Sequence, residues 1–185
     1  SLNLVLVYIV IGGLFVGGLV FKMIRLLNLR RSMRLGYEGE VATGQELNQL
    51  MFHGYHVYHD FVADKFNIDH IVVGPAGVFA VETKARAKPV SNNRKEDAQV
   101  VYDGRFIHFP NWKETRPLEQ ARKQAVWLEL WLSTATGEKT QVRPVLALPG
   151  WFVKRTASNG LPVINPKQFL KIANPANGNL LEERR

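Results

Sequence analysis

The chain has 185 residues, of which 46% are hydrophobic and 22% charged, so it is long and apolar enough to fold around a core and is not a disordered chain. It contains no cysteine, which excludes disulfides, thiolate zinc sites and cysteine nucleophiles. The formal net charge of +8 favours a polyanionic partner such as DNA, RNA or an anionic membrane surface, although charge that serves only solubility would give the same value.

The first predicted element is an apolar helix over residues 2–27 that is long enough to cross a lipid bilayer. Residues 4–21 carry no charge, and about twenty helical residues span a hydrocarbon core of roughly 30 Å. Basic residues, beginning with Lys22 and Arg25, follow this run instead of preceding it, which is the reverse of a secretory signal. Under the positive-inside rule we expect the N-terminus outside and the rest of the chain in the cytoplasm.

Within this helix, Gly13 and Gly17 have the spacing of small residues in membrane helices that pack closely together. That spacing would allow a homo-oligomer, although glycine is common in membrane helices in any case. Because the chain begins at Ser1, we expect at least an initiator methionine before it. After the helix we predict a basic juxtamembrane linker, one globular domain and a C-terminal tail without periodicity: residues 28–35, 36–173 and 174–185.

The predicted elements of the globular domain mix helices with strands. In chain order they are a helix, three strands, a hairpin, a helix, a strand, a short strand and a last helix: residues 37–52, 55–61, 68–73, 78–83, 100–109, 117–133, 142–148, 161–164 and 166–172. This order predicts an α/β (α+β) fold with one central mixed sheet.

The hairpin formed by the second and third strands carries the most informative side chains. Period two places Glu82 and Lys84 on the same face of their strand. If the turn is symmetric, with Gly74 opposite Gly77, then Asp69 lies directly opposite Glu82. Two carboxylates this close repel each other, so one takes up a proton unless a cation binds between them. Oxygen ligands of this kind suit Mg²⁺ or Mn²⁺, which keep several waters for substrate phosphates.

Two alternatives to this interpretation stay open. Pro75 has a negative φ, so the turn could be a three-residue bulged loop with Gly77 left-handed, which would move Asp69 to the other face. A simple ion pair between Glu82 and Lys84 on an exposed strand would show the same residue pattern. If a metal does bind, it would activate a water for phosphodiester hydrolysis, and Lys84 would orient that water or neutralise charge in the transition state.

Three stretches of the sequence closely resemble the nuclease-related domain (NERD) family, which is grouped with the PD-(D/E)xK nucleases. They are Gly-Tyr-Glu-Gly-Glu at residues 36–40, the hairpin from Asn-Ile-Asp-His to Glu-Thr-Lys at residues 67–84, and Pro-Leu-Glu-Gln at residues 117–120. The resemblance implies a restriction-endonuclease-like core, a central mixed sheet flanked by helices, and divalent-metal-dependent hydrolysis. It implies that Asp69, Glu82 and Glu40 bind the metal and are catalytic together with Lys84 and Gln120.

A basic stretch after the hairpin is a candidate for phosphate contacts, although a solvated connector would look the same: Arg86, Lys88, Arg94 and Lys95. The three-residue spacing of His53, His56 and His59 would suit zinc on a helix. We instead expect surface histidines, because a turn and a strand would carry them. Trp127 and Trp131 are expected in the core because they are four residues apart on a predicted helix.

Together these features predict a membrane-anchored nuclease that uses Mg²⁺ or Mn²⁺ to hydrolyse phosphodiester bonds, with DNA as the expected substrate and no small-molecule cofactor. The alternative is a catalytically inactive module of the same fold that binds nucleic acid or scaffolds a membrane complex. The first predicts cleavage that depends on Asp69 and Glu82. The second predicts binding that weakens steeply with salt, without cleavage.

Overall fold

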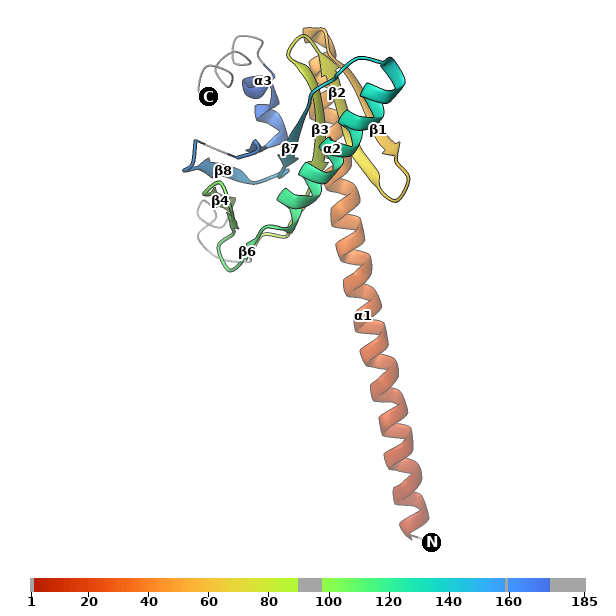
Figure 1. Ribbon diagram of the computed structural model, residues 1–185. Coiled ribbons are helices and arrows are strands. Elements are labelled where there is room, and N and C mark those ends of the chain that lie inside the picture. The colour runs from red at the N-terminus through yellow and green to blue at the C-terminus, as the bar shows by residue number, and fades with distance from the viewer. Residues whose placement is uncertain (1, 90–97, 159, 174–185) are drawn as a thin grey trace. The chain divides into compact units, whose positions relative to one another are not determined.

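The structure is a computed structural model that describes residues 2–89, 98–158 and 160–173 (Figure 1). The chain divides into two compact units, Ser1–Tyr37 and Glu38–Arg185. Helix α1 (Leu2–Asn48) is continuous over 47 residues, so the segment predicted as a linker, residues 28–35, is helical. The predicted tail, residues 174–185, lies outside the described residues.

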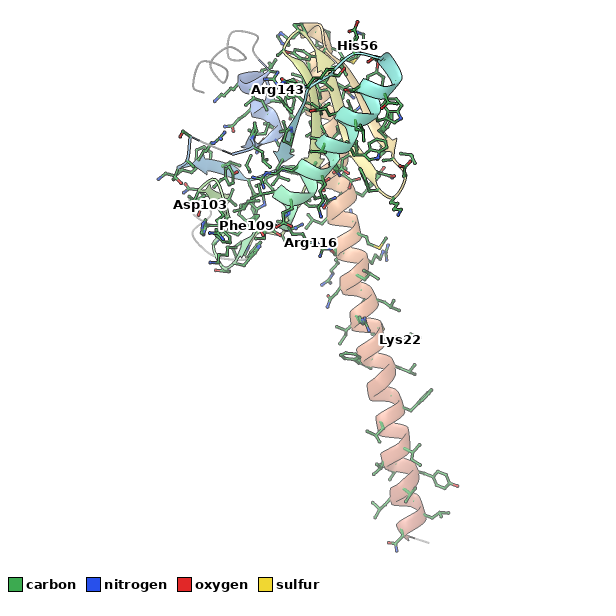
Figure 2. All side chains as sticks on the ribbon, viewed as in Figure 1. Lys22, His56, Asp103, Phe109, Arg116 and Arg143 are labelled. Carbon is green, nitrogen blue, oxygen red and sulfur yellow. The ribbon has the colours of Figure 1, made fainter. Side chains whose placement is uncertain are left out.

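The first unit is the N-terminal part of α1, and its apolar side chains between residues 4 and 33 are exposed. Leu14 is 73% exposed and Phe15 67% exposed, and Lys22 also projects from the helix (Figure 2). By length and composition α1 is able to cross a membrane, and none of its most apolar stretch is buried. An exposed apolar surface of this size is stable only in apolar surroundings. The prediction that this helix is a candidate membrane span is therefore confirmed, by its length and composition.

A five-stranded mixed sheet forms the centre of the second unit. Its order is β1-β2-β3-β7-β9, where the first three strands pair antiparallel and the last two continue the sheet in parallel. The strands are β1 (His56–Val62), β2 (Asn67–Gly74), β3 (Gly77–Thr83), β7 (Val142–Ala147) and β9 (Val163–Ile164). This arrangement confirms the predicted mixed α/β class with a central mixed sheet.

A second mixed sheet, of four short strands, has the order β6-β5-β4-β8. Its strands are β4 (Gln99–Tyr102), β5 (Ile107–His108), β6 (Lys113–Glu114) and β8 (Phe152–Arg155). The β4–β5 hairpin is the predicted one, and Asp103 stabilises its turn by accepting hydrogen bonds from the backbone N–H groups of Arg105 and Phe106. The prediction of a lone hairpin missed the rest of this sheet, because strands of two to four residues are too short to show periodicity.

Helices cover both faces of the central sheet. The end of α1, the 3-10 helix η1 (Gln49–His53) and α3 (Phe169–Ile172) contribute to one apolar cluster, whereas α2 (Arg116–Thr136) packs on another. The 3-10 helix η3 (Pro166–Gln168) directly precedes α3. The two clusters lie on opposite faces of β2. Val72 belongs to the first cluster together with Leu47, and its neighbour Ile71 belongs to the second together with Leu128. Each fully buried side chain of this type contributes about 1.5–3 kcal/mol. Figure 1 shows α2 running across the strands.

The expected core position of Trp127 and Trp131 is wrong in part. Trp127 is half-buried, but Trp131 is 44% exposed. Both rings pack against Phe61 of edge strand β1, with centroid separations of 6.3 Å and 5.2 Å. The side of α2 that carries them therefore lies at the edge of the sheet, where one face of a ring stays open. The predicted surface positions of the three histidines are confirmed: His53, His56 and His59 are exposed.

Candidate active site

The pairing of β2 with β3 decides where the acidic side chains lie. The two strands keep one unbroken register that starts with Gly74 opposite Gly77. Continued along both strands, this register sets Asp69 opposite Glu82, as the symmetric turn predicts. The alternative with a three-residue bulged loop is therefore wrong, although Gly77 does adopt a positive φ of 104°.

Glu82 is the most buried carboxylate of this group, at 1% exposure. Its Oε1 forms an ion pair with the Lys84 ammonium, and its Oε2 accepts a hydrogen bond of 2.5 Å from Gln124 Nε2. Burial, followed by repulsion from Asp69, raises the pKa of Glu82 to about 7, against the opposing effects of Lys84 and Gln124. The ionised form is therefore unfavourable without an additional cation.

Asp69 and Glu40 are two further carboxylates of this group, and they come from different elements. The backbone N–H of Thr83 donates a hydrogen bond of 2.7 Å to Asp69 Oδ2, which fixes that carboxylate against β3. Burial raises the pKa of Asp69 in spite of this hydrogen bond and the nearby Lys84. Burial also raises the pKa of Glu40 on α1, and repulsion from Asp69 is the next cause, so these two carboxylates lie within electrostatic reach of each other.

Asp60 is a further acidic residue that the sequence analysis did not single out. The β1–β2 register pairs His59 with His70 and Phe61 with Ile68, so Asp60 falls opposite Asp69. Among the residues that the structure describes, it is the only non-glycine residue with a positive φ, 51°. Its charge raises the pKa values of both Asp69 and Glu40. An aspartate inside a predicted strand was the available signal, because strands disfavour aspartate whereas the left-handed region tolerates it.

The glutamine that contacts Glu82 is Gln124, one helical turn beyond the predicted Gln120. Gln120 lines a pocket together with Lys84, so it lies at the border of the carboxylate group. Gln124 is 2% exposed, and its Nε2 also donates to the Asn67 carbonyl at 3.1 Å. Residues four apart share one face of a helix, and that spacing was the signal that could have found Gln124.

The predicted phosphate-contacting residues are described only in part. Arg86 forms a two-pronged ion pair with Glu114, with an Nε–Oε1 distance of 2.9 Å and an Nη2–Oε2 distance of 3.0 Å. The Lys88 ammonium lies 6.0 Å from the centroid of the Trp151 ring. Arg94 and Lys95 fall outside the described residues.

Residues 35–149, more than half of the chain, match the family model of the nuclease-related domain. The chain belongs to the nuclease-related domain (NERD) family. No curated protein and no solved structure matches it. The matched range contains all five residues predicted as catalytic, and also Asp60 and Gln124. Membership points to a nuclease-related function, to contact with nucleic acid and to the use of a divalent metal.

The carboxylates of the NERD domain suit a divalent cation that keeps most of its waters. Within residues 2–89, 98–158 and 160–173, no three or more His, Asp or Glu side chains are close enough together to hold an ion by themselves. Mg²⁺ is commonly bound by one or two carboxylates together with waters and substrate phosphates, which matches the pair Asp69 and Glu82. Burial and, after it, repulsion from Asp69 raise the pKa of Glu82, and a cation there would relieve the repulsion.

On the opposite face of β2, the NERD domain buries His70 against the exposed His59. His59 Nδ1 lies 2.8 Å from His70 Nδ1, and His59 Nε2 lies 3.0 Å from Asn48 Oδ1. Because an amide oxygen only accepts, His59 carries its hydrogen on Nε2, and His70 must then donate from Nδ1. Burial, followed by the neighbouring His59, lowers the pKa of His70 to about 4. His70 therefore packs as a neutral side chain.

Proposed function

We propose that this chain is a membrane-anchored nuclease that hydrolyses phosphodiester bonds in DNA and depends on Mg²⁺ or Mn²⁺. The observation that carries the proposal is the pair of carboxylates on adjacent strands, Asp69 and Glu82, with the Lys84 ammonium against Glu82. Buried carboxylates whose ionised forms are disfavoured cost stability, and such groups concentrate at functional sites.

Each side chain has a separate role in this proposal. Asp69 and Glu82 hold the metal, with Glu40 as a further ligand. When bound, the metal polarises the scissile phosphate and lowers the pKa of a bound water. Lys84 positions the attacking water and neutralises charge that develops on the phosphate in the transition state. The Thr83 N–H fixes the orientation of the Asp69 carboxylate before substrate binds.

Glutamines and basic residues complete the proposed site. Gln124 fixes the orientation of Glu82 through its hydrogen bond to Oε2, and Gln120 lies beside Lys84 where it can reach the substrate. The net charge of +8 favours approach of a polyanion. Contacts to DNA phosphates are assigned to the basic stretch after the hairpin: Arg86, Lys88, Arg94 and Lys95.

The proposed location follows from the apolar helix and the charges behind it. Residues 2–27 span the bilayer, and the basic residues from Lys22 onward keep the domain over residues 36–173 on the cytoplasmic side. A nuclease held in this way acts on nucleic acid that comes to the membrane surface. Association through Gly13 and Gly17 stays a prediction. In the single chain no atom lies within 4 Å of a methyl group placed at either glycine.

The proposal is tested with the full chain, purified in detergent and mixed with plasmid DNA. Cleavage is expected with Mg²⁺ or Mn²⁺ and not with a chelator. It should disappear in Asp69→Asn and in Glu82→Gln, which keep the shape of each side chain and remove its charge. Glu138→Gln is the matched control, because Glu138 is an exposed acid at the far end of α2. Cleavage that survives in both site variants would assign the activity to other residues or to a contaminant.

One observation favours the second candidate, an inactive module that binds nucleic acid or scaffolds a membrane complex. Both oxygens of Glu82 already have partners, Lys84 on Oε1 and Gln124 on Oε2. In that case the carboxylate pair stabilises the fold and does not bind a metal. The same preparation would then bind DNA with an affinity that falls steeply with salt, without cleaving it under any metal condition.

A further inference from the structure

A pocket of about 300 Å³ opens beside the carboxylate pair, at the start of α2. It lies between the end of β3, strand β6 and the first turns of α2, where Figure 2 labels Arg116. Six residues line it: Lys84, Arg86, Glu114, Arg116, Pro117 and Gln120. Two of them, Lys84 and Gln120, also belong to the candidate active site, so the pocket and the site share a wall.

The charges of the pocket favour an anion. Three cationic side chains face one carboxylate, which leaves a formal excess of two positive charges. Lys84 is paired with Glu82, and Arg86 with Glu114. Arg116 is exposed and forms no ion pair within the described part of the chain. It is therefore the cation of the pocket that is available to a ligand.

Arg86 is held rigidly in the pocket wall. Its Nε and Nη2 donate to the two oxygens of Glu114, and its Nη1 donates to the Ala85 carbonyl at 3.1 Å. Its backbone carbonyl accepts a hydrogen bond of 3.2 Å from Nε1 of the buried Trp151. Because these bonds fix the guanidinium in advance, a ligand does not have to order this side chain when it binds.

The size and lining of the pocket favour a phosphate over a nucleotide base. A volume of about 300 Å³ is at the lower end of ligand sites, and no aromatic ring is among the lining residues on which a base could stack. Guanidinium, ammonium and amide groups are instead the donors that bind phosphate oxygens.

We propose that this pocket binds one phosphate group of the nucleic-acid strand, adjacent to the phosphate that is hydrolysed, and that Arg116 is its principal contact. The inference rests on the proposed function, because it takes the strand to be the substrate of the site that shares Lys84. The phosphate is either an internal phosphodiester or the monoester at a strand end. Both present the same anionic oxygens, and the experiment separates them.

The test measures binding of the full chain in detergent to short fluorescent DNA duplexes without divalent ions, so that no cleavage is needed. Arg116→Ala is expected to weaken binding about tenfold at low salt and to reduce the slope of log affinity against log salt by about one. Arg116→Lys should recover part of the loss. The matched control is Arg122→Ala, since Arg122 is an exposed arginine on the same helix and does not line the pocket.

Chemical changes in the DNA then locate the phosphate. Neutral methylphosphonate linkages are placed one at a time along the strand, and a second set of duplexes carries or lacks a terminal phosphate. If the pocket binds an internal phosphodiester, one methylphosphonate weakens binding to the natural protein about tenfold and has no effect on Arg116→Ala. If it binds a strand end, the terminal phosphate shows that dependence on Arg116 instead.

The inference is overturned if Arg116→Ala and Arg122→Ala weaken binding equally, or if every linkage has the same effect in the natural protein and in Arg116→Ala. These outcomes are independent of cleavage. A protein that binds DNA through Arg116 but never cuts it would contradict the proposed hydrolysis and leave the phosphate pocket intact. A protein that cuts DNA without dependence on Arg116 would support the proposed hydrolysis and contradict the phosphate pocket.

Discussion

The two faces of strand β2 bury ionisable groups with opposite consequences. On one face, the β2–β3 register, continued one residue beyond its last pair, sets Asp69 opposite Glu82, and burial and mutual repulsion make the ionised carboxylates unfavourable. On the other face, His70 meets His59 at 2.8 Å, and burial and the neighbouring ring make the charged imidazole unfavourable. Asp69 and His70 are adjacent in sequence, so a single strand carries both environments.

The difference lies in how each face can be stabilised. The histidine face carries no charge at neutral pH, because His70 loses a proton there, and the contacts of His70 with His59 and of His59 with Asn48 need no charge. The carboxylate face is stabilised by gaining a proton or a cation, since Lys84 and Gln124 together still leave the pKa of Glu82 at about 7. The first arrangement is that of a structural contact, and the second is that of a site with a cationic ligand.

The largest effect is expected at Glu82. Glu82→Gln should reduce metal-dependent cleavage about 1,000-fold, because it removes a charge on which metal binding depends. It should also change the pH dependence of stability. The pKa of Glu82 is raised in the folded chain from 4.5 to about 7, so the contribution of this group to stability is fully present below about pH 4.5 and is lost as the pH rises to about 7.

The measurement is urea unfolding of the full chain in detergent with a chelator present, followed by the fluorescence of the four tryptophans, all of which lie beyond residue 110. In Glu82→Gln the loss of stability between pH 4.5 and 7 should disappear. A variant with the same pH profile as the natural chain would show that Glu82 does not carry the strained charge.

His70 should produce the opposite pH dependence. Its pKa is lowered in the folded chain from 6.5 to about 4, so the folded state is favoured above about pH 6.5 and loses stability as the pH falls toward 4. A shift of this size corresponds to at most about 3 kcal/mol. His70→Phe removes the titrating group and should flatten the acid limb of the same unfolding series. An unchanged acid limb would assign the loss to other groups.

Gln124 and Gln120 form a matched pair for testing the contact to Glu82. Gln124→Ala removes the hydrogen bonds to Glu82 and to Asn67 and should lower stability by about 1–2 kcal/mol and cleavage about tenfold. Gln120→Ala should leave stability within about 0.5 kcal/mol, because Gln120 lines the pocket and makes no such buried contact. Equal destabilisation of the two variants, measured by urea unfolding, would contradict the role given to Gln124.

The smallest effect is expected at Asp60, which combines a charge near the site with a left-handed backbone. Asp60→Asn keeps the tolerance for the φ of 51° and removes the charge, so stability should change by less than about 0.5 kcal/mol. Asp60→Ala lacks that tolerance and should lose about 1 kcal/mol. The difference between the two variants measures the backbone strain, and no difference would contradict it.

The parts of the fold that could be predicted from the sequence are those with strong local signals. The hairpin of β2 and β3 has two β-rich runs and a Gly-Pro-Ala-Gly turn, and the symmetric form of that turn, one of the two forms that the sequence left open, is the one observed. Helix α2 has regular apolar spacing and a proline in its first turn. In these segments local geometry and tertiary packing demand the same conformation.

What escaped prediction depends on contacts between distant segments. The second sheet pairs β4 with β8, which lies about fifty residues further along the chain. Both strands are too short to show strand periodicity in the sequence. Gln124 rather than Gln120 meets Glu82 because of where α2 lies along its own axis over the sheet, and the helical pattern leaves that position open by one turn. Trp131 is exposed because the sheet ends at β1.

The central claim, that Asp69 and Glu82 together bind a divalent cation, is tested most directly by calorimetric titration of the full chain with Mn²⁺ at pH 7. One ion should bind per chain. Binding should release part of a proton, detected by repeating the titration in buffers of different ionisation enthalpy, because Glu82 is partly protonated at this pH. Asp69→Asn and Glu82→Gln should each abolish the binding. Binding of equal strength in either variant, or no binding to the natural chain, would contradict the account.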